Sequence, residues 1–432
     1  MKKILATTLA ALMALSLTAC GSSTAAGTAD GGTAASSAPK TLVIYQNKAE
    51  VTEPMQTYAD AWGKANNVTV TVKTCTGSCD YAAGMKADIA AGDTPDIFII
   101  EGDTGYDQYK DIIAPMDGED WTKNTQYAFK RDGVVYGYPV AIEGYGLAYN
   151  ADILEKAGVD PSTLTTLSGY KAAFEKIDSM KSELGLDGVV SLTAADGSYW
   201  VMCQHDFAGY LSSGNAYDDT TVIDKALNGE VDADRLSTYA DWVELLYKYS
   251  NQTMLTTGSA DEQMAQFGAG KYAFLHQGTW ADQPIANAGG TFKMGFAPYA
   301  TLGDKECDGL FLGAPSWYVL NKDSANIDVA KQFLNDLCNS DDGKALMVTK
   351  IGLVSAFTNN TLKPAGALAS ALSDWISAGK TAYSFTNQYK TPSGFNNDVL
   401  GPIYSQFAAG GVDKAGFIKL FTDAIATIPT LK

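Results

Sequence analysis

The sequence predicts an α/β fold in which parallel or mixed sheets are flanked by helices. After the first forty residues, short β-rich apolar runs alternate with segments whose apolar residues recur at helical spacing. Such a β-α-β-α-β order favours a parallel sheet with helices on its faces. The length of 432 residues suits two or three domains, and 46% hydrophobic residues are too many for a disordered chain.

The first strand is expected at Thr41–Tyr45, followed by a helix with Thr52 as its cap and Pro54 in its first turn. A second strand is expected at Val68–Val72. The apolar stripe of the next helix ends before Gly92, and a third strand is expected at 96–100.

Later segments show the same alternation of short apolar runs and segments with helical spacing. Strands are expected at 140–142, 271–275, 293–296 and 317–320, and helices at 151–157 and around 329–337. The stretch 164–255 and the C-terminal third are predicted to be mainly helical.

The N-terminus has the form of an export signal. Lys2 and Lys3 precede a run of 16 uncharged residues, which is shorter than the ~20 that span a bilayer. The run ends in Leu-Thr-Ala-Cys20, which resembles the bacterial lipoprotein box, where the cysteine is lipidated. Residues 1–19 are therefore expected to be a signal peptide and Cys20 a lipid anchor. Residues 20–40, rich in Gly, Ser, Thr and Ala, are expected to be a flexible tether.

The charge excludes two classes of partner. The chain carries 31 basic and 49 acidic residues, a net charge of −18. This argues against binding to nucleic acid and against docking on an anionic membrane through a basic patch. We therefore expect no nucleic acid partner and membrane contact through the lipid alone.

The cysteines suit an oxidising location. Cys75 and Cys79 are close enough in sequence for a local disulfide, although two reduced thiols are the alternative. Cys203, Cys307 and Cys338 add an odd number of thiols, so at least one stays unpaired in the expected monomer. A zinc site would need further ligands that the sequence does not offer, and no metal or cofactor is expected.

Catalytic signatures are absent from the sequence. It contains no G-x-S-x-G elbow, no P-loop and no HExxH motif. The run that begins at Asp304 imitates a calcium loop, but its twelfth position is Pro315 where a bidentate Glu is required. A pair of glycosidase carboxylates cannot be identified by spacing among 49 acidic residues.

Aromatic residues are well supplied, with 23 Tyr and 7 Trp. Their flat rings suit the apolar face of a sugar, while carboxylates and amides suit its hydroxyls. Core packing is the alternative role for any one of these aromatics.

Four motifs in order carry a family resemblance: Thr41–Tyr45, Gly92–Ile97, Tyr138–Asn150 and Gly270–Trp280. Together they resemble the extracellular solute-binding proteins of ABC transporters, in the carbohydrate-binding branch that includes the maltose-binding protein. The resemblance runs from about residue 41 to the C-terminus.

The resemblance implies a two-lobed periplasmic-binding-protein-like fold with the ligand in a cleft between the lobes. Lobe 1 is expected to comprise residues 41–141 and 316–352, and lobe 2, with the hinge segments, residues 142–315 and 353–432. It also implies a lipid-anchored receptor at the outer face of the bacterial cell membrane. This receptor would capture a mono- or oligosaccharide and deliver it to permease subunits, with no bond chemistry.

The resemblance also implies candidate ligand-binding residues. Trp280 matches a stacking tryptophan, Asp103 a hydroxyl-binding aspartate and Glu143 a sugar-contacting carboxylate. The remaining candidates, either after the first strand or in loosely aligned positions, are Gln46, Asn47, Lys48, Glu50, Tyr145, Tyr199, Trp200, Trp317, Asn397 and Asp398.

Departures and alternatives accompany these assignments. Ile100 and Thr104 stand where maltose binders have tryptophan and arginine, so maltose specificity is not carried across. Asp103 could instead cap a helix, and Glu143 could bond backbone amides at a hinge. The competing functions are a same-fold receptor for another solute such as a polyamine, and a secreted glycosidase.

Overall fold

The largest sheet combines strands from two distant parts of the chain. In the computed structural model, which describes residues 40–48, 51–75 and 79–431, its order is β2–β1–β3–β13–β6–β5, with β4 paired to β13. Its strands are β1 (Lys40–Gln46), β2 (Val68–Thr74), β3 (Ile97–Glu101), β4 (Ile113–Ala114), β5 (Phe129–Arg131), β6 (Val134–Pro139) and β13 (Ser316–Asn321). β1 runs parallel to β2 and β3, as predicted, and β13 inserts antiparallel between β3 and β6.

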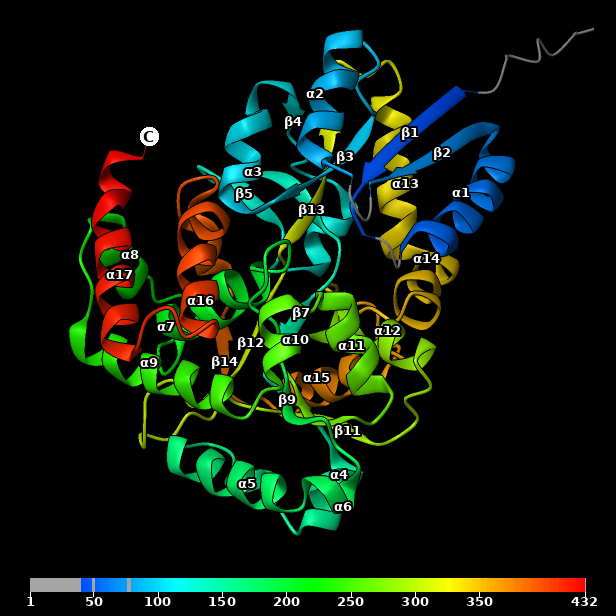
Figure 1. Ribbon diagram of the computed structural model, residues 1–432. Helices are drawn as coiled ribbons and strands as arrows, with labels where there is room; N and C mark the ends of the chain where they lie inside the picture. Colours follow the sequence, from blue (N-terminus) through cyan, green and yellow to red (C-terminus); the bar gives the residue numbers. More distant parts are fainter. Residues whose placement is uncertain (1–39, 49–50, 76–78, 432) are drawn as a thin grey trace, which may run out of the picture. The chain divides into compact units, whose positions relative to one another are not determined.

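Helices cover this sheet (Figure 1). They include α1 (Thr52–Asn66), α2 (Tyr81–Ala91), α3 (Gly102–Tyr109), α13 (Ile327–Asn339) and α14 (Asp341–Ala345). α1 buries Met55, Ala59 and Trp62 on the predicted stripe. The predicted cap was wrong, because Val51 occupies the N-cap position and Thr52 is already helical. α2 ends at Gly92, whose φ of 77° is a left-handed conformation that glycine adopts at little cost.

Two smaller sheets form the rest of the framework. One has the order β11–β8–β10–β9 and the other β14–β12–β7. Their strands are β7 (Glu143–Tyr145), β8 (Leu147–Asn150), β9 (Gly188–Ser191), β10 (Tyr272–Leu275), β11 (Met294–Ala297), β12 (Leu310–Gly313) and β14 (Ala382–Ser384). The predicted strands at 271–275 and 293–296 are confirmed within a residue or two. β9 and β14 were missed inside stretches predicted to be mainly helical.

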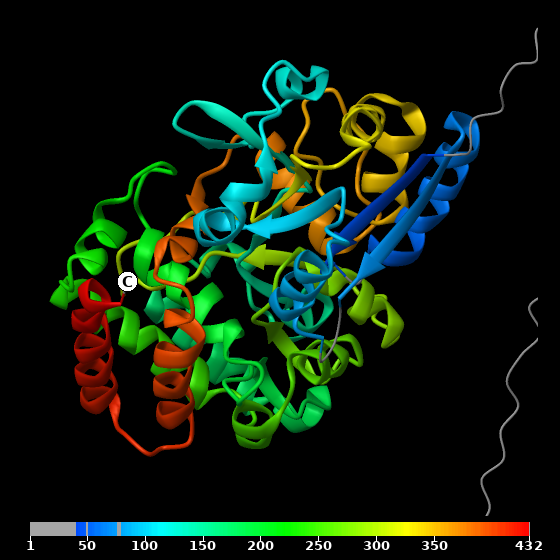
Figure 2. The ribbon, with the colours of Figure 1, turned by 90° about the horizontal axis from the view of Figure 1, so that it is seen from above.

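Most of the remaining chain is helical, as expected. The helices are α4 (Ala151–Ala157), α5 (Leu167–Ser179), α6 (Lys181–Leu184), α7 (Phe207–Ser212), α8 (Thr221–Leu227), α9 (Ala233–Lys248), α10 (Gln252–Thr257), α11 (Ala260–Gly268), α12 (Asp282–Asn287), α15 (Ala367–Ser377), α16 (Gly401–Ala408) and α17 (Lys414–Thr427). Figure 2 shows α16 and α17 packed side by side near the C-terminus. Two π-helical segments, Val201–Asp206 and Phe395–Leu400, contact each other; such segments are frequent at functional sites.

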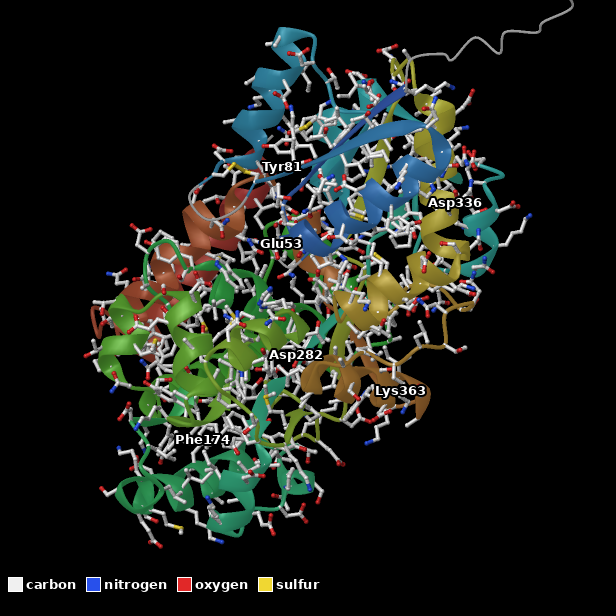
Figure 3. All side chains as sticks on the ribbon, turned by 90° about the vertical axis from the view of Figure 1, so that its right-hand side faces the viewer. Glu53, Tyr81, Phe174, Asp282, Asp336 and Lys363 are labelled. Atoms are coloured by element: carbon white, nitrogen blue, oxygen red, sulfur yellow. A yellow bond between two sulfur atoms is a disulfide. The ribbon has the colours of Figure 1, made fainter. Side chains whose placement is uncertain are left out.

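We call the seven-stranded sheet with its helices the first lobe, and the two smaller sheets with theirs the second lobe. In Figure 3, Tyr81 marks the first lobe and Phe174 the core of the second. The chain crosses between the two sets of strands at residues 140–142 and 314–315, and again near Val354. There the amide of Ile142 donates to the carbonyl of Val354 at 2.9 Å. The boundaries predicted for the lobes stay predictions.

Asp282 ties two parts of the second lobe together (Figure 3). Its carboxylate accepts hydrogen bonds from the amides of Leu368 (2.9 Å) and Ala369 (2.8 Å), at the start of α15. A carboxylate satisfies the unpaired amides there and complements the helix dipole. Burial nevertheless raises the pKa of Asp282 above its usual value.

The predicted disulfide between Cys75 and Cys79 is present just after β2. Cys203, Cys307 and Cys338 are buried and unpaired. Within the described ranges, no helix is both long and apolar enough to cross a bilayer. The predicted signal peptide, Cys20, most of the predicted tether, and Glu50 lie outside the described residues.

Candidate functional site

A cavity of about 420 Å³ opens between the end of β3 in the first lobe and residues 388–397 in the second. We call it the amide cavity. Its polar lining residues include Asn47, Glu101, Gln108, Gln204, Gln388, Asn396 and Asn397. Tyr81, Tyr109 and Tyr389 supply rings. Among the described lining residues Glu101 is the one carboxylate and no Lys or Arg is present, so the cavity suits an uncharged polar molecule better than an anion.

Two amides that line this cavity have unused hydrogen-bonding capacity. Gln388 is fully buried, yet neither its Nε2 nor its Oε1 makes a hydrogen bond of ordinary geometry to a described residue, although the Tyr389 hydroxyl is near. Asn47 donates from Nδ2 to Glu101 Oε1 at 3.1 Å, while its buried Oδ1 has no partner there. Leaving buried polar groups unpaired costs free energy, so binding of a ligand that donates to and accepts from these atoms would be favourable.

The backbone that carries Gln388 is held firmly. Its carbonyl accepts hydrogen bonds from Thr391 Oγ1 (2.9 Å) and from Asn396 Nδ2 (3.0 Å). The neighbouring Asn387 donates to Ser212 Oγ at 3.0 Å, which fastens the segment to α7. The Gln388 amide therefore lies on a firmly held backbone, and it still makes no ordinary hydrogen bond to a described side chain or backbone group.

Charged and close contacts join the lobes around the amide cavity. Lys48 Nζ donates to Glu143 Oε1 at 2.8 Å, and both side chains are mostly buried. Asp103, in the first turn of α3, pairs with Arg131 at 3.2 Å and with Lys390 of the second lobe at 3.7 Å. Gly102, with a φ of 59°, lets Tyr389 approach, because a Cβ there would lie 2.5 Å from that of Tyr389.

A second cavity, of about 230 Å³, is lined by Trp280 of the second lobe and by residues 349–353, which follow α14. We call it the tryptophan cavity. It shares no lining residue with the amide cavity among the described residues. Trp280 is partly buried, so part of its ring is available to this space.

A buried polar cluster lies behind Trp280. The ring centroid of His205 is 4.6 Å from that of Trp280 and 4.9 Å from that of Tyr145. The adjacent Asp206 is fully buried, and its Oδ1 lies 3.0 Å from both His276 Nε2 and Trp242 Nε1. Desolvation, reinforced by the charges of His276 and Lys48, holds the pKa of His205 well below its usual value.

The structure brings some of the predicted residues to the cavities. Asn47 and Asn397 line the amide cavity and Trp280 lines the tryptophan cavity. Lys48 and Glu143 meet each other across the lobes. Asp103 forms ion pairs and does not cap α3, whose N-cap is Glu101.

Other predicted residues lie outside both cavity linings. The amide of Gln46 bonds to the backbone of Lys48 and to Thr74 Oγ1 at the end of β2. Trp317 Nε1 donates to the carbonyl of Tyr127 at 2.7 Å within the first lobe. Tyr145 is fully buried among aromatic rings, and Trp200 packs on His205. Tyr199 packs against Gly401, and Asp398 is exposed beside Gly394.

Sequence reasoning missed Glu101, Gln204, Gln388, Tyr389 and Asn396. A signal was available, because amides flank the breaker run Pro392-Ser-Gly394 in a segment otherwise taken as mainly helical. Nothing in the spacing pairs this segment with β3, however, since the two are almost three hundred residues apart.

The sequence has relatives of known function. It is 28% identical over 356 residues to a maltooligosaccharide ABC transporter solute-binding lipoprotein of Streptococcus pneumoniae, covering 78% of this chain and 76% of the relative. It is 25% identical over 340 residues to the melibiose/raffinose/stachyose-binding protein MelE of Bacillus subtilis, covering 75% and 76%.

Solved structures share the fold. A Bacillus subtilis binding protein in an open conformation superposes with a TM-score of 0.70 at 21% identity, covering 91% of this chain and 98% of that one. A Bacillus licheniformis sugar transporter in complex with stachyose gives 0.68 at 19%, covering 91% and 100%. The predicted fold class is thereby confirmed. Residues 57–373 match the bacterial extracellular solute-binding proteins, and the chain belongs to that family.

Proposed function

We propose that this protein is a lipid-anchored receptor that captures a mono- or oligosaccharide between its lobes and delivers it to the permease of an ABC importer. The observation that carries the proposal is the amide cavity, where buried Gln388 and partly buried Asn47 hold polar atoms that make no ordinary hydrogen bond to a described residue. Family membership and the sugar-binding relatives support the same conclusion.

A sugar would satisfy these amides from both sides. Each hydroxyl can donate one hydrogen bond and accept others, which suits Oδ1 of Asn47 as well as both ends of the Gln388 amide. Because these two residues come from different lobes, a sugar bonded to both would join the lobes.

The tryptophan cavity would supply the apolar part of recognition. A pyranose ring presents C–H groups that pack well on an indole, and a rigid ring makes the contact at low entropic cost. Trp280 is the side chain we assign to this role. We place Lys48 and Glu143 at the junction of the lobes, where ligand hydroxyls can compete for their ion pair.

Ligand binding would act by shifting an equilibrium between open and closed arrangements. A sugar that bonds to both lobes favours the closed arrangement by the free energy of those added contacts. The crossing segments near Ala141, Pro315 and Val354 are the natural hinges, since few backbone torsions there need to change. The permease would then recognise the closed arrangement.

Attachment to the membrane completes the proposal. Cys20 would carry the lipid, and the Gly- and Ser-rich stretch up to residue 40 would let the body move away from the bilayer. Residues 41–141 with 316–352 would form the first lobe, and 142–315 with 353–432 the second.

A thermal-shift screen of the purified protein tests the proposed function. Monosaccharides and oligosaccharides are compared with polyamines and amino acids, each near a hundred times an assumed dissociation constant. A ligand at that concentration adds ~2.7 kcal/mol to the state that binds it, which moves the melting temperature by several degrees. A shift with one class of sugar supports the proposal. A shift with polyamines alone would instead favour a polyamine receptor, in which the Glu101 carboxylate would pair with the cationic ligand.

A further inference from the structure

An unbroken chain of buried amides connects the indole of Trp280 to the framework of the second lobe. Trp280 Nε1 donates to Gln277 Oε1 at 2.7 Å, and Gln277 Nε2 donates to Gln263 Oε1 at 3.0 Å. Gln263 Nε2 then donates to the carbonyls of Ser191 (2.8 Å) and His276 (3.1 Å). Gln263 and Gln277 are essentially inaccessible to solvent.

The direction of this chain is fixed at both ends. Backbone carbonyls only accept hydrogen bonds, so both N–H groups of Gln263 must face Ser191 and His276. The Oε1 of Gln263 is then left for the amide nitrogen of Gln277. An indole N–H only donates, so the oxygen of Gln277 must face Trp280. A flipped amide at either position would lose hydrogen bonds inside the protein, which is expensive.

The anchors of the chain are rigid elements. Ser191 ends β9 and His276 directly follows β10, which is paired in parallel with β9. Gln263 lies on α11, and its own carbonyl accepts from Ser191 Oγ at 2.9 Å. The strands therefore hold Gln277 Oε1 in place. Rotating the indole so that its N–H leaves this oxygen would break the hydrogen bond.

The ring of Trp280 is also supported from behind. His205 lies 4.6 Å away and Tyr145 6.0 Å away, centroid to centroid. Packing alone limits tilting of the indole, but a half-turn about the Cβ–Cγ bond would keep the ring plane and carry the N–H to the other side. The hydrogen bond to Gln277 supplies that missing restraint.

We propose that Gln277 is a positioning residue, which fixes the indole of Trp280 for sugar stacking without lining either cavity. The inference rests on the proposed function, because it assigns the stacking role to Trp280. Pre-set aromatic surfaces lose less conformational freedom on binding, so the chain of amides raises affinity by ordering the ring beforehand.

Gln277→Met removes the amide while keeping an unbranched side chain of similar size. We expect sugar affinity, measured by titration calorimetry, to fall roughly three- to tenfold, the usual value of one hydrogen bond. The decisive comparison uses Trp280→Phe, whose ring has no N–H. In that background Gln277→Met should cause no further loss. An equal loss in both backgrounds, or no loss in either, would overturn the proposal.

Asn150→Ala is the matched control for general destabilisation. Asn150 is buried in the same lobe and caps α4, so its loss weakens the fold by about as much as a lost cap usually does, without touching Trp280. Its sugar affinity should equal that of the wild type.

A spectroscopic measurement separates failure of this inference from failure of the proposed function. In protein labelled with ¹⁵N-tryptophan, the indole N–H resonance of Trp280 is identified by its absence in Trp280→Phe. Slow exchange with solvent is expected in the wild type and fast exchange in Gln277→Met, whether or not sugar binds. Fast exchange in the wild type would overturn the inference. A wild type with slow exchange but no affinity for any sugar would overturn the proposed function alone.

Discussion

In the proposed function, the amide cavity and the tryptophan cavity would contribute to different parts of sugar recognition. In the first, a buried amide at Gln388 has no ordinary partner among the described residues. In the second, the polar edge of Trp280 is already bonded, which leaves the ring itself as the useful surface. One part of the proposed site would therefore supply unmet hydrogen-bonding capacity, and the other a fixed apolar plane. A sugar has a matching rim and face.

Truncating the ring tests the apolar half and should give the largest effect. Trp280→Ala is expected to weaken sugar binding by about a hundredfold, or ~2.7 kcal/mol, because the main apolar contact is lost. Calorimetry measures the loss, and circular dichroism should show an unchanged fold since Trp280 is only partly buried. Undiminished binding would remove the tryptophan cavity from the site and leave the amide cavity alone.

His205, in the buried polar cluster behind Trp280, should make the stability of the protein depend on pH. The folded protein keeps His205 neutral because its pKa is lowered well below 6.5, whereas the unfolded chain takes up a proton near that value. At this group the unfolded state thus binds more protons below pH 6.5, so the contribution of His205 to the free energy of unfolding falls as pH drops. The contribution between pH 7.5 and 5.5 is about 1.4 kcal/mol.

Urea unfolding at the two pH values measures this term. His205→Gln should lose that part of the pH dependence while retaining whatever the other groups contribute. An identical pH dependence in variant and wild type would show that folding does not lower the pKa of His205.

A substitution in the amide cavity should have opposite effects on stability and on sugar affinity. Gln388→Leu removes a buried amide that lacks a good partner, so the ligand-free protein should gain about 1 kcal/mol in unfolding free energy. The same change should lower sugar affinity roughly three- to tenfold. Chemical denaturation and calorimetry on one preparation test both. A variant that loses stability would mean that the amide is already satisfied and that the contrast between the cavities is false.

The smallest effect is expected at the ion pair between Asp103 and Lys390. Both side chains are about one-third exposed, so the pair should contribute less than about 1 kcal/mol to closure and be screened by salt. Lys390→Met should therefore reduce the salt dependence of ligand affinity. Calorimetry at low and high salt checks this, with Lys123→Met as control because its pair with Asp120 is exposed in the first lobe. Salt dependence that persists in full would point to a charged ligand.

Much of the fold could be predicted because its signals are local. The apolar runs of β1, β2, β3, β10 and β13 and the stripes of α1 and α13 need only their own residues. β9 and β14 were missed because these short strands lie inside stretches whose other local signals are helical. The Thr52 cap was a local inference that failed, since the backbone turns one residue earlier.

The site was harder to predict for a physical reason. Sequence identifies Trp280 as a residue suited to stacking, but the partner of its N–H, Gln277, is an ordinary amide in any one-dimensional view. Gln388 matters because of the hydrogen bonds that it lacks, and a missing partner can be recognised only in three dimensions. Likewise Asp103, taken as a ligand residue by resemblance, forms ion pairs with residues far away in sequence.

The three unpaired thiols have a practical consequence. Cys203, Cys307 and Cys338 are buried, and burial raises the pKa of each above its usual value, so little reactive thiolate forms near neutrality. Cys75 and Cys79 are already joined. Cysteines introduced at one exposed position on each lobe could therefore be labelled with fluorescent dyes without removing the native thiols. The protein could therefore serve, with its native cysteines in place, as the scaffold of an optical sensor for its own ligand.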